Sequence, residues 1–193
     1  MKDICIVLVV IVMMMFAIRY SYQIYKRKIN PTPSTWLIFL LGTGLSLTTY
    51  TIAEKSDFRS GILNTTDVAV VLIILLSIII WGNKATFFKR FEKWYLSGIV
   101  IIIIYGFTFG DAWGSNVFTQ VLISIGYIPT IHNLISVKRN VESITTWGCN
   151  TLAGFIALYP AMIDGNSLAA LYSIRTIILT LGIIGIMFYY KLR

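Results

Sequence analysis

This sequence has few of the residues on which catalytic and metal chemistry depends. Its 193 residues include one histidine and two cysteines, and only 12% of them are charged. A lone His132, with Cys5 and Cys149 far apart in apolar segments, supplies neither a metal-ligand cluster nor a disulfide framework. Paired carboxylates, a Ser-His-Asp set and a glycine-rich phosphate loop are also missing. We therefore expect no enzyme activity, no metal and no cofactor.

What the sequence has in abundance is apolar residues, at 57% of the chain with a mean hydropathy of +0.80. Runs such as "VAVVLIILLSIIIWG" have roughly the length that a helix needs to cross a hydrocarbon core of about 30 Å. The net charge of +8 comes from basic residues that flank these runs. That placement is typical of membrane topology and not of a nucleic-acid-binding face. The composition predicts an all-α integral membrane protein without a nucleic-acid partner.

The apolar runs predict seven transmembrane helices, and the charges between them predict an orientation. The expected spans are 4–25, 34–53, 62–82, 95–109, 116–135, 144–163 and 168–190. Alternate connecting segments are basic, and the others are neutral or acidic. Because basic segments remain in the cytoplasm, we expect the N-terminus outside and the C-terminus in the cytoplasm. Anionic lipids at the cytoplasmic face are then expected partners.

Two similar stretches, "QIYKRKINPTPSTW" at 23–36 and "LISVKRNVESITTW" at 134–147, lie 111 positions apart. This offset places span one on five, two on six and three on seven. Each copy has a basic pair, Arg27-Lys28 and Lys138-Arg139, at the end of a span. We predict two parallel three-helix repeats, 1–82 and 116–193, joined by a linker with helix four at 83–115. A chance match of two basic loops is the alternative.

The stretch "IGYIPTIHNLISVKRNVESITTWGCNTLAG" resembles the PQ-loop signature, with Tyr127 and Pro129 near the end of a helix, a basic hairpin and a following helix. Thr130 stands where that family has glutamine. The predicted 3+1+3 layout is similar to that of the PQ-loop and SWEET-like (MtN3/saliva-type) membrane transporters, so the chain is identified as a divergent member. The resemblance implies parallel repeats that move by alternating access. Pro129 is then the expected hinge, since proline removes a helical hydrogen bond.

Three residues are candidates for contact with a substrate. Trp36 and Trp147 occupy equivalent positions in the two repeats, and Asn150 lies one turn after Trp147. The indole rings are expected to stack on a sugar ring or a flat heterocycle. The alternative for the tryptophans is an aromatic belt at the membrane interface, and for Asn150 a hydrogen bond between helices.

Ionisable residues inside the predicted spans are further candidates. Arg175 lies about 12 Å into the last span, where a charge is costly unless it is paired or hydrated. Asp67 is the expected partner, and the two form either a gate or a static charge pair. His132 is the candidate for proton coupling, although a histidine bonded near a helix end is the alternative.

Together these features favour a transporter of a small solute, such as a sugar-like, amino-acid-like or vitamin cargo. The competing interpretation is a membrane receptor, or a trafficking adaptor whose basic hairpins bind partners. The sequence leaves open which membrane holds the protein and whether copies associate as a homo-oligomer.

Overall fold

The computed structural model describes residues 1–29, 31, 33–54, 58–82, 90–137 and 142–191, and the regular structure of this part is entirely helical. The helices are α1 (Lys2–Tyr25), α2 (Pro33–Ala53), α3 (Ile62–Trp81), α4 (Arg90–Phe109), α5 (Ala112–Gly126), α6 (Ile128–Val137), α7 (Ile144–Ile163) and α8 (Ser167–Lys191). The all-α prediction is confirmed. Five of the predicted spans agree with single helices to within two residues at each end.

Four helical stretches are long and apolar enough to cross a membrane: Lys2–Tyr25, Thr35–Ala53, Ile62–Trp81 and Ser167–Tyr190. Large apolar side chains cover the outside of these helices, among them Val7, Ile11, Met15, Leu72, Leu76, Ile79, Ile80 and Ile178. Polar side chains are instead buried, among them Ser46, Asn64, Asp67, Asn116, Gln120, Asn150, Thr151, Arg175, Thr176 and Thr180. Apolar surfaces of this extent are unfavourable in water, and this distribution fits a protein whose outer surface faces lipid.

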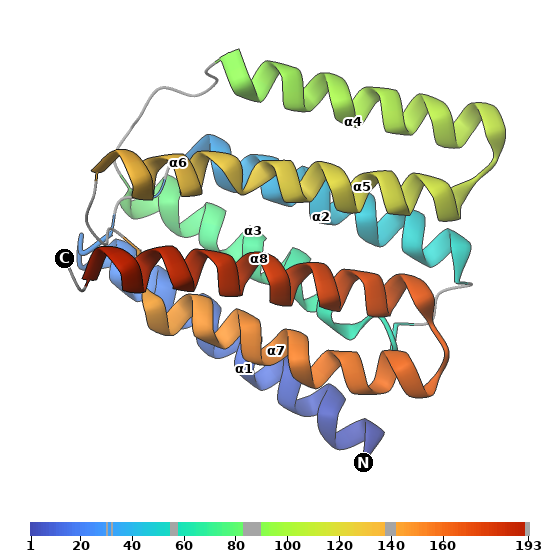
Figure 1. Cartoon of the computed structure of the whole chain (residues 1–193), viewed down its shortest axis with the longest axis horizontal. Helices are drawn as coiled ribbons and strands as arrows, with labels where there is room; N and C mark the ends of the chain where they lie inside the picture. Colours follow the sequence, from blue (N-terminus) through green and yellow to red (C-terminus); the bar gives the residue numbers. More distant parts are fainter. Residues whose placement is uncertain (30, 32, 55–57, 83–89, 138–141, 192–193) are drawn as a thin grey trace.

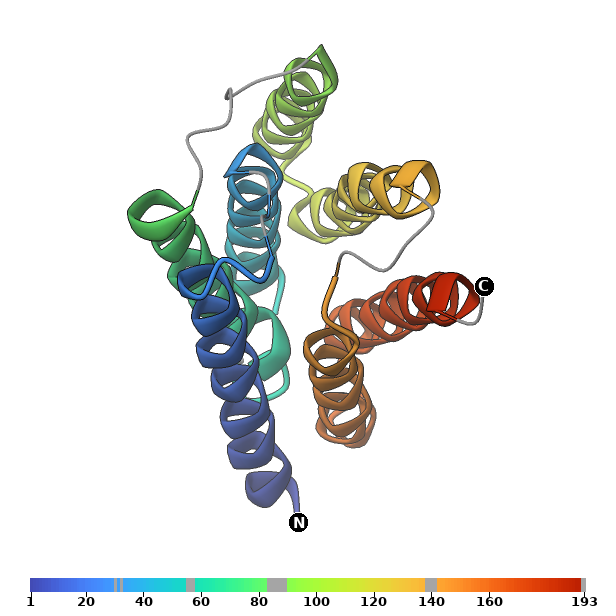
Figure 2. The ribbon, with the colours of Figure 1, turned by 90° about the vertical axis from the view of Figure 1, so that its left-hand side faces the viewer.

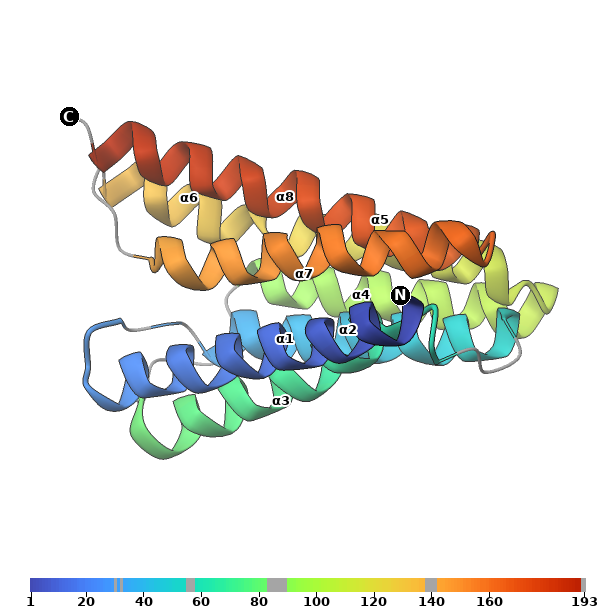
Figure 3. The ribbon, with the colours of Figure 1, turned by 90° about the horizontal axis from the view of Figure 1, so that it is seen from below.

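The long helices run roughly alongside one another, so the bundle has two ends (Figures 1 and 3). We call them the Tyr25 end, where α1 finishes and α2 and α7 begin, and the Asp164 end, where α7 finishes and α8 begins. Each polar or aromatic cluster described below is placed relative to these two ends.

Viewed end-on, the helices form two groups, α1 to α3 and α5 to α8, with α4 at the edge (Figure 2). Within the first group α3 packs against both α1 and α2, and within the second group α8 packs against both α5 and α7. The groups meet through α1 against α7 and through α2 against α5, and α4 packs on α5 and α2.

The prediction of a single fifth span over 116–135 is wrong, because the structure divides this segment into α5 and α6 at Tyr127. The amide of Tyr127 donates to the Ser124 carbonyl, three residues back, at 3.2 Å. Pro129 has no amide hydrogen to continue the ladder, which explains a break at this point. The fourth helix also differs from expectation, since α4 begins at Arg90 and not at 95.

The first basic hairpin begins in a well-defined turn after α1. The Lys28 amide donates to the Gln23 carbonyl and the Arg27 amide to the Ile24 carbonyl, both at 2.9 Å. This is the Schellman pattern of helix termination, and it places Arg27 at a left-handed φ of 53°. Pro33 then opens α2 as its first residue. The second basic pair, Lys138-Arg139, lies outside the described residues.

Candidate functional site

Trp36 and Trp147, predicted from equivalent positions in the sequence, belong to one chain of aromatic rings. The ring centroids of Tyr20 and Trp36 are 5.0 Å apart, and those of Trp36 and Phe39 are 5.9 Å apart. Phe39 then contacts Tyr127 at 5.0 Å, and Tyr127 contacts Trp147 at 6.0 Å. We call these five residues the aromatic chain. Only 6% of Trp36 and 5% of Trp147 is exposed, so neither ring lies on the lipid-facing surface where an interfacial belt would place it.

The aromatic chain joins the two helix groups. Tyr20 comes from α1 and Trp36 and Phe39 from α2, whereas Tyr127 lies at the α5–α6 break and Trp147 in α7. Tilted and edge-on ring pairs at such distances are favourable beyond the area that they bury. The break before Pro129 therefore brings an aromatic side chain from the second group against the first.

Glu142 lies beside the aromatic chain at the Tyr25 end, just before α7. One of its carboxylate oxygens accepts hydrogen bonds from the Tyr20 hydroxyl and the Trp147 Nε1, both at 3.4 Å. Desolvation raises the pKa of the Glu142 carboxyl to about 7, against the lowering effect of these two donors. Next to it, the Gln23 Nε2 donates to the Ser143 Oγ at 3.1 Å. We call the contacts of Glu142 and Ser143 with α1 the Tyr25-end tie.

Sequence reasoning missed Glu142 as a site residue, because it stands in a basic loop where a solvated carboxylate is the ordinary expectation. Its Thr-Trp neighbours at 146–147 carried the only signal. Glu142 lies five positions before Trp147, and it contacts the indole because α7 begins between them, at Ile144.

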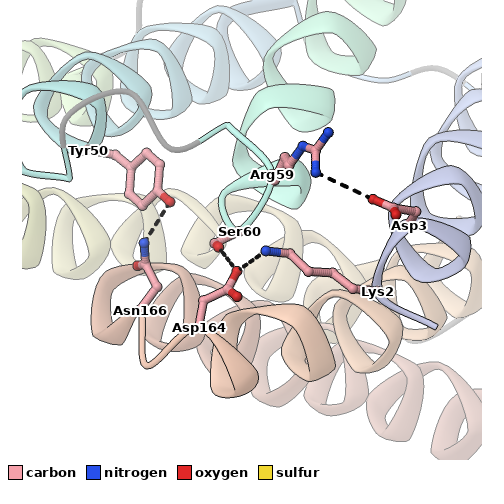
Figure 4. Close-up of polar contacts among 7 residues, drawn as sticks. All are labelled: Lys2, Asp3, Tyr50, Arg59, Ser60, Asp164 and Asn166. Carbon is pink, nitrogen blue, oxygen red and sulfur yellow. Dashed lines mark hydrogen bonds and ion pairs between the residues drawn. The ribbon is translucent and has the colours of Figure 1, made fainter.

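The Asp164 end has a second tie between the same two helices (Figure 4). The Asp164 carboxylate pairs with Lys2 of α1 and accepts a hydrogen bond from Ser60. These partners hold the pKa of Asp164 below its usual value. Close by, Arg59 pairs with Asp3 at 3.7 Å. We call the Asp164 contacts with Lys2 and Ser60 the Asp164-end tie.

Asn166 adds a further contact near the Asp164 end. Its Nδ2 donates to the Tyr50 hydroxyl at 2.9 Å, and its Oδ1 accepts from the Ala169 amide at 2.9 Å. The first turn of α8 is thereby anchored to the last turn of α2.

Asn150 lies in α7, one helical turn after Trp147, and is 4% exposed. Its Oδ1 is buried and has no hydrogen-bond partner. The structure therefore does not show the interhelical hydrogen bond that was the alternative for this oxygen. A buried carbonyl acceptor without a donor is unfavourable, and such groups are uncommon in folded proteins.

Arg175 is 8% exposed, and it makes no ion pair with Asp67. Tyr172 lies between them instead. The Tyr172 hydroxyl donates to an Asp67 carboxylate oxygen at 2.6 Å, and the Arg175 guanidinium carbon lies 4.3 Å from the centroid of the Tyr172 ring. The two residues therefore form no direct charge pair in the described part of the chain, and Tyr172 connects them across α3 and α8 through a hydrogen bond to one and a cation–π contact with the other.

Only one guanidinium nitrogen of Arg175 has a partner. Nη2 donates to the Thr176 Oγ1 at 3.2 Å, whereas Nε and Nη1 are buried without any partner. Tyr172 links Arg175 of α8 to Asp67 of α3, and α8 packs against α3. The guanidinium therefore lies toward the interior, between the two helix groups.

His132, the predicted proton-coupling residue, has an exposed side chain in α6, and its Nδ1 lies 3.4 Å from the Ser136 Oγ. The structure does not bring it to the aromatic chain. Pro129 is the second residue of α6, directly after the break. In the described part of the chain, no three His, Cys, Asp or Glu residues are grouped so that they could hold a metal ion.

Comparison with known proteins adds no relative: no family model matches the chain, and the curated proteins and the solved structures contain no match.

Proposed function

We propose that this protein carries a small solute across a membrane by alternating access, with the repeats 1–82 and 116–193 as its two moving units. In this proposal α1 corresponds to α5 and α6 together, α2 to α7, and α3 to α8. The remaining helix, α4, is the linker of a seven-span 3+1+3 arrangement. The resemblance to PQ-loop and SWEET-like transporters points the same way.

The helix contacts support this correspondence. The third helix of each unit packs between the other two, α3 in one and α8 in the other. Exchange of the units turns the α1–α7 contact into the α5–α2 contact, and both contacts are present. Parallel repeats related in this way are typical of carriers that alternate between two openings.

The observation that carries the proposal is that two buried side chains on neighbouring helices, Asn150 of α7 and Arg175 of α8, have polar atoms without partners. The Asn150 Oδ1 and the Arg175 Nε and Nη1 are buried and unsatisfied. A purely structural role leaves these groups unexplained, because each one lowers stability. A solute that supplies the missing hydrogen bonds accounts for them. Trp36 and Trp147 are the proposed walls for its flat or apolar part.

The two ties suggest how the units move. The α1–α7 contact is closed by the Tyr25-end tie on one side of the membrane and by the Asp164-end tie on the other. In an alternating-access cycle one tie opens while the other remains closed. A receptor or an adaptor has no need for both ends to open in turn.

The test uses pairs of cysteines in a background where Cys5 and Cys149 are serine. A short bis-methanethiosulfonate linker between Gln23→Cys and Ser143→Cys locks the Tyr25 end, and the same linker between Lys2→Cys and Asp164→Cys locks the Asp164 end, since long side chains make the native contacts at both places. Purified protein is reconstituted into liposomes, and uptake of glucose, alanine, lysine, lactate and nicotinamide riboside is measured. We expect uptake of at least one solute, and a loss of roughly tenfold or more with either lock that a reductant reverses.

The matched control is a lock inside one unit. The Ser77 Oγ donates to the Ser21 Oγ at 2.8 Å between α3 and α1, so Ser21→Cys with Ser77→Cys joins helices that move together. This pair should leave uptake unchanged. Equal uptake with all three locks, or no uptake above empty liposomes for any solute, would sink the proposal. Loss of binding to anionic vesicles after Arg27→Glu and Lys28→Glu would then favour the adaptor.

A further inference from the structure

The side chain of Arg175 carries information about the chemistry of the solute. Three of its five N–H donors, two on Nη1 and one on Nε, have no acceptor, although the residue is 8% exposed. Its one hydrogen bond, from Nη2 to the Thr176 Oγ1, holds the guanidinium in place without neutralising it. A cation in this state is expensive in a membrane interior unless an anion meets it.

The neighbours of Arg175 do not supply that anion. Asp67 is the only acidic residue that interacts with it in the described part of the chain, and its carboxyl group is held by the Tyr172 hydroxyl at 2.6 Å. Tyr172 fills the space between them with its ring under the guanidinium. The unpartnered nitrogens are therefore free of a fixed counter-ion.

We infer that Arg175 binds the carboxylate group of a solute that carries a single negative charge. This inference rests on the proposed function. Guanidinium donors match carboxylate oxygens in geometry and charge. The site offers a single positive charge with the Asp67 carboxyl group nearby, so a dianion such as phosphate is disfavoured. The aromatic ring of Tyr172 beside the guanidinium suits a solute with an apolar body.

The first test measures binding without transport. The melting temperature of the detergent-purified protein is recorded at pH 8, where inorganic phosphate is mainly the dianion. The additions are acetate, lactate and benzoate, their uncharged amides, and inorganic phosphate, all at equal ionic strength in sodium chloride. At least one carboxylate should raise the melting temperature by roughly 5 °C near saturation. Its amide and phosphate should have little effect.

Variants of Arg175 assign the effect. Arg175→Gln should abolish the shift, and Arg175→Lys should retain it with an affinity weaker by roughly tenfold, since the charge remains but the planar fork is lost. Arg19→Gln, which removes an exposed arginine on α1, should leave the shift unchanged. Without any solute, Arg175→Gln should melt at the wild-type temperature or higher, because an unmatched buried charge has been removed.

Four outcomes would overturn the inference. The first is that no carboxylate stabilises the protein more than its amide. The second is that phosphate acts as strongly as the best carboxylate. The third is that Arg175→Gln keeps the shift. The fourth is that Arg175→Gln lowers the melting temperature without solute by several degrees, as the loss of a structural charge pair would. If Arg175→Gln does not fold, the titration of Arg175→Lys decides.

The liposome assay separates this inference from the proposed function. Uptake of glucose that is unaffected by Arg175→Gln would leave the transporter intact and reject the carboxylate cargo. A carboxylate shift that depends on Arg175, without uptake of any solute, would keep the binding site and reject transport.

Discussion

The two contacts that join the helix groups, α1–α7 and α2–α5, correspond to each other in the proposed repeat but are built differently. The α2–α5 contact has a buried amide network in which the Asn116 Nδ2 donates to the Ser46 carbonyl at 2.7 Å and to the Thr49 Oγ1 at 3.0 Å. The Gln120 Nε2 joins it, at 2.9 Å from the Ser46 Oγ. The α1–α7 contact has its polar ties at the two ends, with apolar residues such as Met13 between them.

The two contacts should therefore differ in how easily they separate. Separating α2 from α5 would leave two buried amide side chains, Asn116 and Gln120, without their α2 partners, and each lost partner is unfavourable in an apolar interior. Separating α1 from α7 at one end breaks only a few hydrogen bonds near the helix ends. We therefore expect the units to part along α1–α7 while α2–α5 remains closer to a fixed pivot.

The largest expected effect comes from breaking the α2–α5 network. Asn116→Leu removes two donated hydrogen bonds and the one that its Oδ1 accepts from Gln120 at 3.0 Å. Interhelical hydrogen bonds in membranes contribute about 0.6 kcal/mol each on average. For the three bonds lost here we expect the free energy of unfolding to fall by about 2 kcal/mol. Unfolding in mixed micelles with increasing sodium dodecyl sulfate measures it. Val121→Leu, at an exposed position of the same helix, is the control and should change little.

A smaller effect is expected at the Tyr25-end tie, and it depends on pH. Glu142 has a folded pKa of about 7, above its ordinary value of 4.5, because its carboxyl group is desolvated. Between about pH 4.5 and pH 7 the folded protein therefore keeps the Glu142 proton, whereas the unfolded chain releases it. Stability should fall as pH rises from about 4.5 to about 7, and then level off.

Glu142→Gln removes this titration and should flatten that part of the stability curve. The expected gain over wild type at pH 8 is about 1 kcal/mol, a value discounted for partial exposure. The measurement is the melting temperature of both proteins from pH 4 to pH 8. Parallel curves for the two proteins would show that Glu142 is not the titrating group.

The smallest effect is expected at the Asp164-end tie. Lys2→Met removes the partner of Asp164, and because the pair is partly exposed we expect a loss of only a few tenths of a kcal/mol at pH 7. The lowered pKa of Asp164 means that its contribution is present above its ordinary pKa of 3.8 and disappears as pH falls below it. Wild type and Lys2→Met should therefore converge in acid. A loss as large as that of Asn116→Leu would contradict the contrast between the two contacts.

Much of the helical layout could be predicted from the sequence because apolar runs are separated by short polar or turn-forming segments. Span 144–163 coincides with α7, and Pro33 opens α2 as helix-capping preferences indicate. The α5–α6 division could not be predicted with the same ease. Pro129 marked a weak point, but proline inside a helix produces either a kink or a full break, and packing around Tyr127 decides which.

The candidate site was predictable in part. Equivalent positions in the two copies singled out Trp36 and Trp147, and the structure places both in one aromatic chain. Arg175 and Asp67 stood out as charges inside apolar runs, yet Tyr172, which lies between them, carried no signal of its own. Glu142 was missed because its burial depends on α1 packing against α7, a contact between residues more than 100 positions apart.

The placement of polar side chains inside and apolar ones outside has a consequence for mutational tolerance. On the outside, exchanges among Ile, Val, Leu and Met at positions such as Ile79 and Ile178 should be nearly silent, because lipid chains accept any of these shapes. In the interior, even isosteric changes at Asn116 or Gln120 remove specific hydrogen bonds. A saturation library should thus show the exposed hydrophobic positions as permissive and the buried polar positions as restrictive, the reverse of the pattern in a water-soluble domain.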